Sequence, residues 1–479
     1  MHMFEEILAK TKEVGVVREV RRNFILVQGL PHAVVNEIVV TEAGDLGFVF
    51  SLKEEFVEVV LLNQAQIRVH MRVVRTARTA SVPVGKTLLG RHIDPLGRAL
   101  DGQPIVAEDA RAVDITPPLI SSRMPIRLPF ETGVAIVDAL VPLGRGQREL
   151  ILGDRKTGKS SFLYQVLTHQ AKQGTICIYA SVGRKHNDIG QFMEFVTKNN
   201  ILNQCVVVSS EASNAPGLIY LTPFSAMAIA EYFKDLGFHT LVIMDDLSTH
   251  AAAYREMSLV ARRFPGRSAY PGDVFYLHSR LMERAGNFNI NQKPVSITCL
   301  PVAQSILGDI TGYITTNLMS MTDGHIFFDN DLFDSGQRPA VNPFVSVTRV
   351  GLQANSGASR DLARELASML ITYKNLLDVS HFGAEISAEA QETLKTGRQL
   401  MLYFTQPLSV TVSHELNQFV IAHIMHGTWR TISDEELPQI LKGIITKASA
   451  DQTYMSLISN TVSHANAITD ILAAQIPLA

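Results

Sequence analysis

Cysteine is scarce in this sequence. Three cysteines occur among 479 residues, and Cys177, Cys205 and Cys299 lie far apart without a CxxC pair. This scarcity excludes a disulfide scaffold and a thiolate zinc site, and it is typical of a reducing compartment. A chain of this length can bury several complete hydrophobic cores, so it needs neither disulfide bonds nor a structural zinc ion for stability.

Long hydrophobic runs and an excess of one charge are also missing. No apolar run approaches the roughly 18–20 residues that cross a bilayer, and the first residues, MHMFEEILAKTK, resemble neither a signal peptide nor a transit peptide. The formal net charge is only -3, which argues against a general nucleic-acid-binding surface or a polybasic membrane clamp. We therefore expect a soluble cytosolic chain, or one that reaches a membrane only through partners.

The sequence changes texture twice along its length. Short valine-rich runs between about 14 and 75 predict a small barrel, and a linker rich in Gly and Pro follows. From Glu149, continuous apolar runs alternate with amphipathic stretches, which is typical of a parallel sheet covered on both faces. Helical patterns dominate from about Ala358. The predicted strands of the middle region are 149–154, 175–182, 204–210, 240–246, 296–302 and 344–350.

A phosphate-binding motif, GxxxxGK[ST], lies between a predicted strand and a predicted helix. Its glycines let backbone N–H groups wrap a phosphate, the helix N-terminus adds its positive end, and Lys159 reaches the outer phosphates. The alternative is a chance match on a glycine-rich turn. The predicted nucleotide-binding residues are Gly153, Asp154, Arg155, Lys156, Thr157, Gly158, Lys159, Ser160 and Ser161.

The acid that completes such a site is expected at the end of a later buried strand. In TLVIMDD, Asp245 and Asp246 follow four apolar residues. We predict that Ser160 and Asp245 hold Mg²⁺, Asp245 through water because this ion keeps much of its hydration shell. The alternative is that either aspartate caps the next helix. The long interval between Lys159 and Asp245 leaves room for further strands and favours a RecA-type ring core.

A general base is missing from the expected place. Hydrolysis of ATP needs a group that orients and polarises water, yet the strand TICIYASV ends in Gly183-Arg184-Lys185. A guanidinium cannot accept a proton at neutral pH. Glu211 could substitute, or it could be a solvated acid of a loop. By this chemistry the pocket binds Mg-nucleotide but is poorly equipped to hydrolyse it.

With these residues laid out, the chain resembles the alpha subunit of F-type ATP synthases over nearly its whole length. The motifs that carry the resemblance are GDRKTGKSS and the stretches 244–286 and 316–351, which begin MDDLSTHAAAYRE and TNLMSMTDGHIFF. The resemblance implies a multidomain fold with an N-terminal small β-barrel (1–75), a central α/β RecA-type P-loop nucleotide-binding domain (76–355) and a C-terminal α-helical bundle (356–479). Arg184 stands where alpha subunits carry Gln and beta subunits carry the catalytic Glu.

The resemblance also implies roles for individual residues. Arg349 corresponds to an arginine finger that acts in the neighbouring catalytic site, whereas the sequence alone would make it an arginine at a strand end. Ser346 and Ser320 match positions that line the same interface. Arg338 and Pro339 match the wall of the adenine pocket, and Gln406 matches a nucleotide-pocket glutamine within a shortened loop.

Partners and setting follow from the same resemblance. It implies Mg²⁺ with ATP or ADP, a catalytic beta subunit in a three-plus-three hexameric ring, a gamma-like central shaft and a delta-like peripheral stalk. We expect a weaker contact with the peripheral stalk, because the sequence begins shortly before the first barrel strand. Proton transport belongs to a membrane sector reached through partners, on the cytoplasmic side of the cell membrane, and no nucleic acid is involved.

Two other functions remain open on the sequence. One is a self-sufficient homohexameric ring motor that acts on RNA or on a polypeptide, which would need a base in each pocket. The other is a related ring ATPase coupled to something other than proton transport.

Overall fold

A computed structural model describes residues 2–63, 66–380, 387–465, 467–473 and 476. The chain divides into two compact units, each built from segments that are not contiguous in sequence. The first unit comprises Met1–Met124, Ala171–Gln304 and Ile310–Thr322, and the second comprises Pro125–Gln170, Ser305–Asp309 and Asp323–Ala479.

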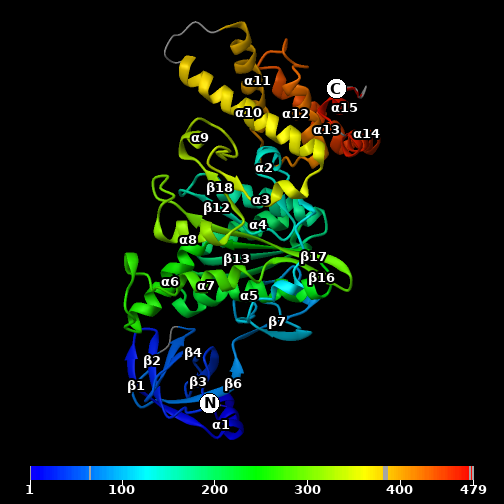
Figure 1. The fold of residues 1–479 in the computed structure, drawn as a ribbon. Helices are drawn as coiled ribbons and strands as arrows, with labels where there is room; N and C mark the ends of the chain where they lie inside the picture. Colours follow the sequence, from blue (N-terminus) through cyan, green and yellow to red (C-terminus); the bar gives the residue numbers. More distant parts are fainter. Residues whose placement is uncertain (1, 64–65, 381–386, 466, 474–475, 477–479) are drawn as a thin grey trace. The chain divides into compact units, whose positions relative to one another are not determined.

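A closed barrel begins the first unit (Figure 1). Its strands are β1 (Val14–Arg21), β2 (Phe24–Gln28), β3 (Glu37–Thr41), β4 (Leu46–Leu52), β5 (Val57–Leu61) and β6 (Arg72–Thr79). They close in the order β1-β2-β5-β4-β3-β6 around a valine-rich core, as the sequence predicts. Helix α1 (His2–Thr11) packs Phe4 against Val40 and Val74. The last strand runs beyond the predicted boundary at residue 75.

The linker after the barrel is tied to the core of the first unit. β7 (Ser81–Val84) pairs antiparallel with β9 (Asp109–Ala112), and β8 (His92–Ile93) pairs with a strand of the core. Short 3-10 turns lie at Lys86–Leu88 and Ile120–Ser122.

A buried arginine fastens this linker. Arg284 donates to both carboxylate oxygens of Glu231, at 2.9 and 2.7 Å, and to the carbonyl oxygen of Val113 at 2.6 Å. The side chain of Arg284 is 1% exposed and that of Glu231 is 4% exposed. Because a buried charge without its partner is strongly destabilising, Arg284 and Glu231 depend on one another, and the bond to the Val113 carbonyl ties the linker to this pair.

The core of the first unit is a parallel sheet in the order β17-β15-β13-β14-β8, with β16 antiparallel on β17. The strands are β13 (Ile176–Arg184), β14 (Cys205–Glu211), β15 (Thr240–Asp245), β16 (Gly286–Ile290) and β17 (Lys293–Gln304). The register places Ser181 opposite Asp245 and Arg184 opposite Glu211. The predicted parallel strands 175–182, 204–210, 240–246 and 296–302 are confirmed.

Helices pack around this sheet. Helix α5 (Pro216–Asp235) is buried from Pro216 to Phe233, as expected for a helix that is apolar on every side. The others are α4 (His186–Lys198), α6 (Leu247–Val260), α7 (Val274–Met282) and α8 (Tyr313–Met321), with 3-10 turns at Leu202–Gln204 and Arg267–Ala269.

The second unit contains a smaller group of strands. β12 (Glu149–Gly153) pairs parallel with β18 (Gly324–Phe328), which pairs antiparallel with β19 (Val347–Thr348), and β10 (Pro129–Phe130) pairs with β11 (Leu143–Gly144). The predicted strand 344–350 is wrong in length and kind, because only two residues pair and Val347 is exposed. The sequence analysis also missed β18, although all five of its residues are buried.

The rest of the second unit is helical. Helices α2 (Ala135–Leu140), α3 (Lys159–Lys172) and α9 (Asn330–Asp334) accompany the strands, and a 3-10 turn spans Gly351–Ala354. The C-terminal helices are α10 (Gly357–Ser380), α11 (Ala388–Phe404), α12 (His414–Met425), α13 (Leu437–Ala450), α14 (Gln452–His464) and α15 (Ile468–Ala473). The helical prediction for this region is confirmed.

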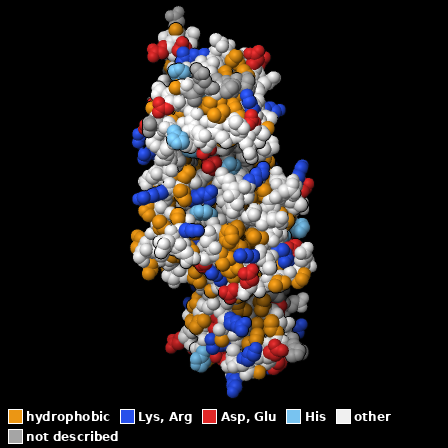
Figure 2. Space-filling model, turned by 90° about the vertical axis from the view of Figure 1, so that its right-hand side faces the viewer, with side chains coloured by type: hydrophobic (Ala, Val, Ile, Leu, Met, Phe, Trp, Pro, Cys, Tyr) orange, Lys and Arg blue, Asp and Glu red, His pale blue; other side chains and the backbone are white. Residues whose placement is uncertain are grey.

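No helix among the described residues is long and apolar enough to cross a membrane. On the face drawn in Figure 2, the described basic and acidic side chains are interspersed.

Candidate functional site

The phosphate loop in the second unit has the context that the sequence predicts. β12 ends at Gly153 and α3 begins at Lys159. Lys156 and Gly158 adopt positive φ angles of 66° and 93°, which turn the backbone sharply between strand and helix, and only glycine does so at no steric cost. The first N–H groups of α3 have no acceptor within the helix, which makes this end suited to an anion.

Lys159 lies back on its own loop. Its Nζ donates to the carbonyl oxygen of Gly153 at 2.7 Å and also to that of Asp154. Thr157 Oγ1 donates to the same Asp154 carbonyl at 2.9 Å. Ser160 and Ser161, at the start of α3, are exposed. The loop therefore holds its lysine through neutral carbonyl groups.

The carboxylate of Asp154 binds the loop to segments that lie later in the chain. It accepts hydrogen bonds from Ser305 Oγ, from the backbone N–H of Gly308 and, at 2.6 Å, from Asn330 Nδ2. Burial alone would raise the pKa of Asp154, but these hydrogen bonds and the charge of Lys159 outweigh it and lower the pKa. Ser305, Gly308 and Asn330 were missed in the sequence because they lie far from the motif along the chain.

The predicted adenine-pocket residues lie in the same unit as the loop. The guanidinium of Arg338 lies 3.5 Å from the centroid of the Phe333 ring and donates to the Phe333 carbonyl at 2.6 Å. The peptide bond between Arg338 and Pro339 is cis. The side-chain amide of Gln406 bonds backbone groups of Gly133, Ala135 and Val410. A hydrogen bond from Gln406 to a base would therefore require one of these bonds to break.

The acidic strand end in the first unit differs from the prediction. Arg184, at the end of β13, forms an ion pair with Asp245 Oδ1, and the hydroxyl of Tyr179 donates to Asp245 Oδ2 at 2.7 Å. Asp245 is 2% exposed. Burial would lower the pKa of Arg184, but Asp245 and Asp246 outweigh it and raise the pKa, so the guanidinium stays charged.

The Mg²⁺ role of Asp245 stays a prediction. A water-mediated magnesium ligand must accept hydrogen bonds from the hydration shell, and each oxygen of this buried carboxylate already has one partner, Arg184 or Tyr179. Among the residues that the structure describes, no group of three or more His, Cys, Asp or Glu side chains could hold a metal ion. The sequence prediction considered the acid without the cation that ends the adjacent strand.

Asp246 has the helix-capping role that the sequence left open. Its Oδ1 accepts from the backbone N–H of Thr249 at 2.6 Å, and its Oδ2 accepts from Gln304 Nε2. Burial and the neighbouring charge of Asp245 raise the pKa of Asp246, although Arg184 and the hydrogen bonds of Thr249 act in the opposite direction.

Glu211 is the partly exposed last residue of β14. Its Oε1 lies 2.8 Å from His186 Nδ1, its Oε2 accepts from Ser213 at 3.3 Å, and its side chain is 39% exposed. These contacts favour the solvated-acid alternative over a role as general base.

The residues predicted for a subunit interface fall in both units. Ser320 lies in α8 of the first unit and donates to the Thr316 carbonyl at 2.9 Å. In the second unit Ser346 bonds the backbone of Phe327 and Asn342. Arg349 directly follows β19, is exposed, and has its backbone N–H bonded to the Asp323 carbonyl at 3.0 Å.

A buried carboxyl group lies at the start of β12. Glu149 is fully buried, its Oε2 accepts from Gln147 at 2.7 Å, and its Oε1 has no hydrogen-bond partner among the described residues. Burial raises the pKa of Glu149 well above its usual value, and the hydrogen bond from Gln147 and the charge of Arg349 do not offset it. The sequence analysis missed this group.

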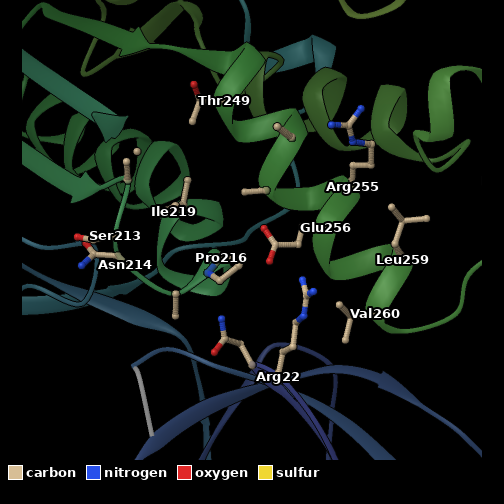
Figure 3. A pocket seen from close by; sticks show the side chains of 16 residues that line it. Arg22, Ser213, Asn214, Pro216, Ile219, Thr249, Arg255, Glu256, Leu259 and Val260 are labelled. Carbon is tan, nitrogen blue, oxygen red and sulfur yellow. The ribbon is translucent and has the colours of Figure 1, made fainter. Parts of the chain in front are cut away.

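A pocket of about 710 Å³ lies within the first unit, between the barrel and the core. Figure 3 shows Arg22 pointing toward it from the barrel and Glu256 from α6, while Arg255 of α6 lines it with its guanidinium turned away. Ser213 and Asn214 line another side. The lining mixes charges of both signs, and none of the predicted nucleotide-binding residues contributes to it.

Comparison with known families decides the relationship. The nucleotide-binding domain of the ATP synthase alpha/beta family matches residues 133–348, and the C-terminal domain of the same family matches residues 356–477. The chain belongs to the ATP synthase alpha/beta family.

The two matches cover most of the site described above. The nucleotide-binding match includes the phosphate loop, Arg184 and Asp245, and the C-terminal match includes Gln406. The architecture of barrel, α/β nucleotide-binding domain and helical domain is that of the ATP synthase alpha/beta family. Because the family name covers alpha and beta chains together, the choice between them depends on individual residues.

Proposed function

We propose that this chain is an alpha-type, nucleotide-binding and largely non-catalytic subunit of a rotary F-type ATP synthase or ATPase. It alternates with a catalytic beta-type subunit in a three-plus-three ring. It binds ATP or ADP in its own phosphate loop and contributes Arg349 to the neighbouring catalytic site. The complete complex couples ATP synthesis or hydrolysis to proton transport, and the isolated chain turns over ATP negligibly.

The observation that carries the proposal is the cationic end of β13. Arg184 is a charged guanidinium bound to Asp245, so it cannot take a proton from water. Glu211, the acid paired with it in the strand register, is the last residue of β14 and lies beside His186. The phosphate loop, in contrast, keeps its glycines, lysine and helix N-terminus. This combination supports binding of a nucleotide without its hydrolysis.

The proposal extends to partners and location. The barrel contributes to the crown of the ring, and the C-terminal helices approach a gamma-like shaft. A delta-like stalk and a membrane proton sector complete the machine, which holds this chain at the cytoplasmic side of the cell membrane. Family membership supports this part of the proposal.

A direct test compares binding with turnover on one preparation. We expect calorimetry to detect ATP binding by the purified chain, while a coupled assay detects negligible hydrolysis. Turnover of several molecules per second by a verified homogeneous preparation would contradict the proposal and favour a self-sufficient homohexamer. Catalysis that appears only after addition of a beta-type chain supports it.

Assembly gives a second test. We expect a six-membered ring on a sizing column when the chain, a beta-type partner and nucleotide are mixed. A chain that stays monomeric under these conditions contradicts the ring proposal without affecting the nucleotide-binding result.

A further inference from the structure

The segment that carries Arg349 has little backbone pairing. β19 consists of only Val347 and Thr348, and it pairs with β18 at the edge of the sheet. Arg349 follows directly, and its backbone N–H donates to the carbonyl oxygen of Asp323 at 3.0 Å. Because a strand of two residues has few ladder hydrogen bonds, side-chain contacts decide how firmly the backbone around Arg349 is held.

The hydroxyl group of Thr348 connects three parts of the second unit. Its Oγ1 donates to the carbonyl oxygen of Pro142 at 2.9 Å, and it accepts from Gln147 Nε2 at 3.2 Å and from the N–H of Gly351 at 3.1 Å. A hydroxyl has one donor and two acceptor positions, so these bonds use all of them. Gly351 also lies so close to Pro142 that a Cβ would be 1.6 Å from its carbonyl oxygen. The backbone on both sides of Arg349 is therefore bound to the segment before β12.

Gln147 is itself held at both ends of its side chain. It is fully buried, its Oε1 accepts from the N–H of Gly144 at 2.8 Å, and its Nε2 also donates to Glu149 Oε2 at 2.7 Å. Hydrogen bonds of this kind lock the rotamer of a supporting side chain. The hydroxyl of Thr348 therefore meets a donor whose position is fixed.

The next residue supports the same segment through a second contact. Arg148 donates to the carboxylate of Asp323 from Nη2 at 2.6 Å and from Nε at 3.0 Å, and its backbone N–H adds a bond of 2.9 Å. A two-pronged bond between arginine and a carboxylate has a defined geometry. The Asp323 carbonyl that accepts from the N–H of Arg349 is thereby held in place as well.

We propose that Gln147 and Thr348 are positioning residues for Arg349, which hold its backbone in the orientation from which the guanidinium reaches the neighbouring catalytic site. This inference rests on the proposed function, which makes Arg349 an arginine finger, and it adds the residues that aim the finger. A finger contributes only where it meets the charge of the transition state. A displacement of about 1 Å can cost about 10²-fold in rate, so the hold on the backbone matters for turnover.

The first test changes the Thr348 hydroxyl in full-length chains that are assembled into rings with a beta-type partner. Thr348→Val keeps the branched shape and removes the three hydrogen bonds, so the single-turnover rate of rings isolated by sizing should fall by about tenfold or more. ATP binding to the partner should change by less than about threefold. Thr348→Ser keeps the hydroxyl and should stay within about threefold of the wild-type rate. A Val variant as fast as the wild type overturns the inference, and so does a Ser variant as slow as the Val variant.

A double-mutant cycle with Arg349→Ala distinguishes positioning from a general effect on stability. If Thr348 acts through Arg349, Thr348→Val should change the rate of Arg349→Ala rings by less than about twofold. An equal loss in both backgrounds would show that the hydroxyl acts independently of Arg349, against the inference. Near-normal turnover of intact Arg349→Ala rings would contradict the proposed finger and the inference together. Slow Arg349→Ala rings with normal Thr348→Val rings would contradict the inference alone.

Gln147→Leu tests the other positioning residue, and it should also slow the ring by about tenfold or more. Its matched control is Gln399→Leu in α11, because Gln399 is also fully buried and its Nε2 donates to the Trp429 carbonyl at 2.8 Å. The control should melt at a lower temperature but turn over ATP at the wild-type rate in intact rings. A control as slow as Gln147→Leu would show that loss of any buried amide slows the ring, which removes Gln147 from the proposal. Should Gln147→Leu fail to fold, the Thr348 variants decide the inference.

Hydrogen exchange on the isolated chain needs neither nucleotide nor partner, so its result does not depend on the proposed function. The N–H of Gly351 donates to Thr348 Oγ1, and we expect exchange in peptides that cover residues 347–352 to be about tenfold or more faster in Thr348→Val. The Ser variant should exchange like the wild type. Unchanged exchange in the Val variant would mean that the hydroxyl does not hold this segment, and the inference would be wrong even if the chain is an alpha-type subunit.

Discussion

The ends of β12 and β13 carry cations that are held in opposite ways. After β12, Lys159 donates to carbonyl oxygens of its own loop. At the end of β13, Arg184 binds the carboxylate of Asp245. A carbonyl bears no formal charge, so an arriving phosphate can offer the lysine a stronger acceptor. The arginine already binds such an acceptor. If it moved away, Asp245 would be a buried carboxylate without its ion pair.

This difference suggests how proteins of one family can have different functions. The loop that recognises phosphate is built from backbone and one lysine, and this chain retains it. The strand end that would supply hydrolytic chemistry is closed by a single guanidinium. On the proposed function, one side chain separates nucleotide binding from hydrolysis, and the following predictions test each half of that proposal.

The largest effect is expected from Arg349→Ala, which removes a charge proposed to act outside the chain's own pocket. A finger meets charge that develops in the transition state, so turnover of the mixed ring should fall by about 10²-fold or more. ATP binding to the partner should change much less. Arg349→Lys should rescue poorly because an ammonium lacks the planar fork. Single-turnover rates measured on rings isolated by sizing give the comparison.

The control for Arg349 is Arg364→Ala. Arg364 is an exposed arginine of α10 that forms an ion pair with Asp361 at 3.2 Å, and its loss should leave turnover unchanged. Near-normal chemistry in intact Arg349→Ala rings would remove Arg349 from the mechanism. Dissociated rings would instead assign it a bracing role.

An intermediate effect is expected from Lys159→Ala, which tests the binding half of the comparison. Loss of a charged donor to phosphate should weaken ATP binding to this chain by about tenfold or more. Most activity of the mixed ring should survive, because we propose that this pocket is non-catalytic. Calorimetry on the chain and steady-state assays on the ring measure the two outcomes. Lys172→Ala, at the exposed far end of α3, should change neither, and complete loss of ring activity with Lys159→Ala would contradict the proposed division of labour.

The smallest effect is expected from Glu149→Gln. Glu149 is a buried carboxyl without an ion pair, whereas the buried carboxyl of Asp245 has one. Because the pKa of Glu149 is raised in the folded chain, the folded state retains its proton above the unfolded pKa of about 4.3 and the wild type loses stability as pH rises from there. The Gln variant avoids this loss. It should therefore match the wild type near pH 4 and be more stable at pH 7 by on the order of 1 kcal/mol.

Urea unfolding at several pH values checks the Glu149 prediction. A Gln variant that is markedly less stable at pH 7 would show that the carboxyl is ionised and useful there. The control is Glu415→Gln in the first turn of α12, for which we expect no such pH-dependent gain.

Much of the fold could be predicted because its strands are continuous apolar runs. The limits of β13, β14 and β15 agree with the prediction within a few residues, and the six barrel strands all exist. β18 was missed because GHIFF is short and begins with Gly and His. The run 344–350 looked like a strand by composition, but only Val347 and Thr348 pair, at the edge of the sheet.

The site was predictable where the chemistry is local in sequence. The phosphate loop needs only its own glycines, lysine and flanking elements, so the motif located it. The bond between Arg184 and Asp245 depends on the register of β13 against β15, and the two residues lie far apart in sequence. Asp154 and Asn330, which form a hydrogen bond, are also far apart in sequence. Side-chain pairs of this kind become visible only once the strands are aligned.

The buried arginine that fastens the linker has a consequence for synthesis of the chain. The barrel can close once Thr79 has left the ribosome, but the Val113 carbonyl must wait for Arg284. At about 5–20 residues per second the delay is roughly ten to thirty seconds. Once Glu231 has been made, it has no buried cation to pair with until Arg284 follows. The nascent protein is then a closed barrel followed by a linker that is not yet bound to the core, and that core also waits for β17, which is made after Arg284.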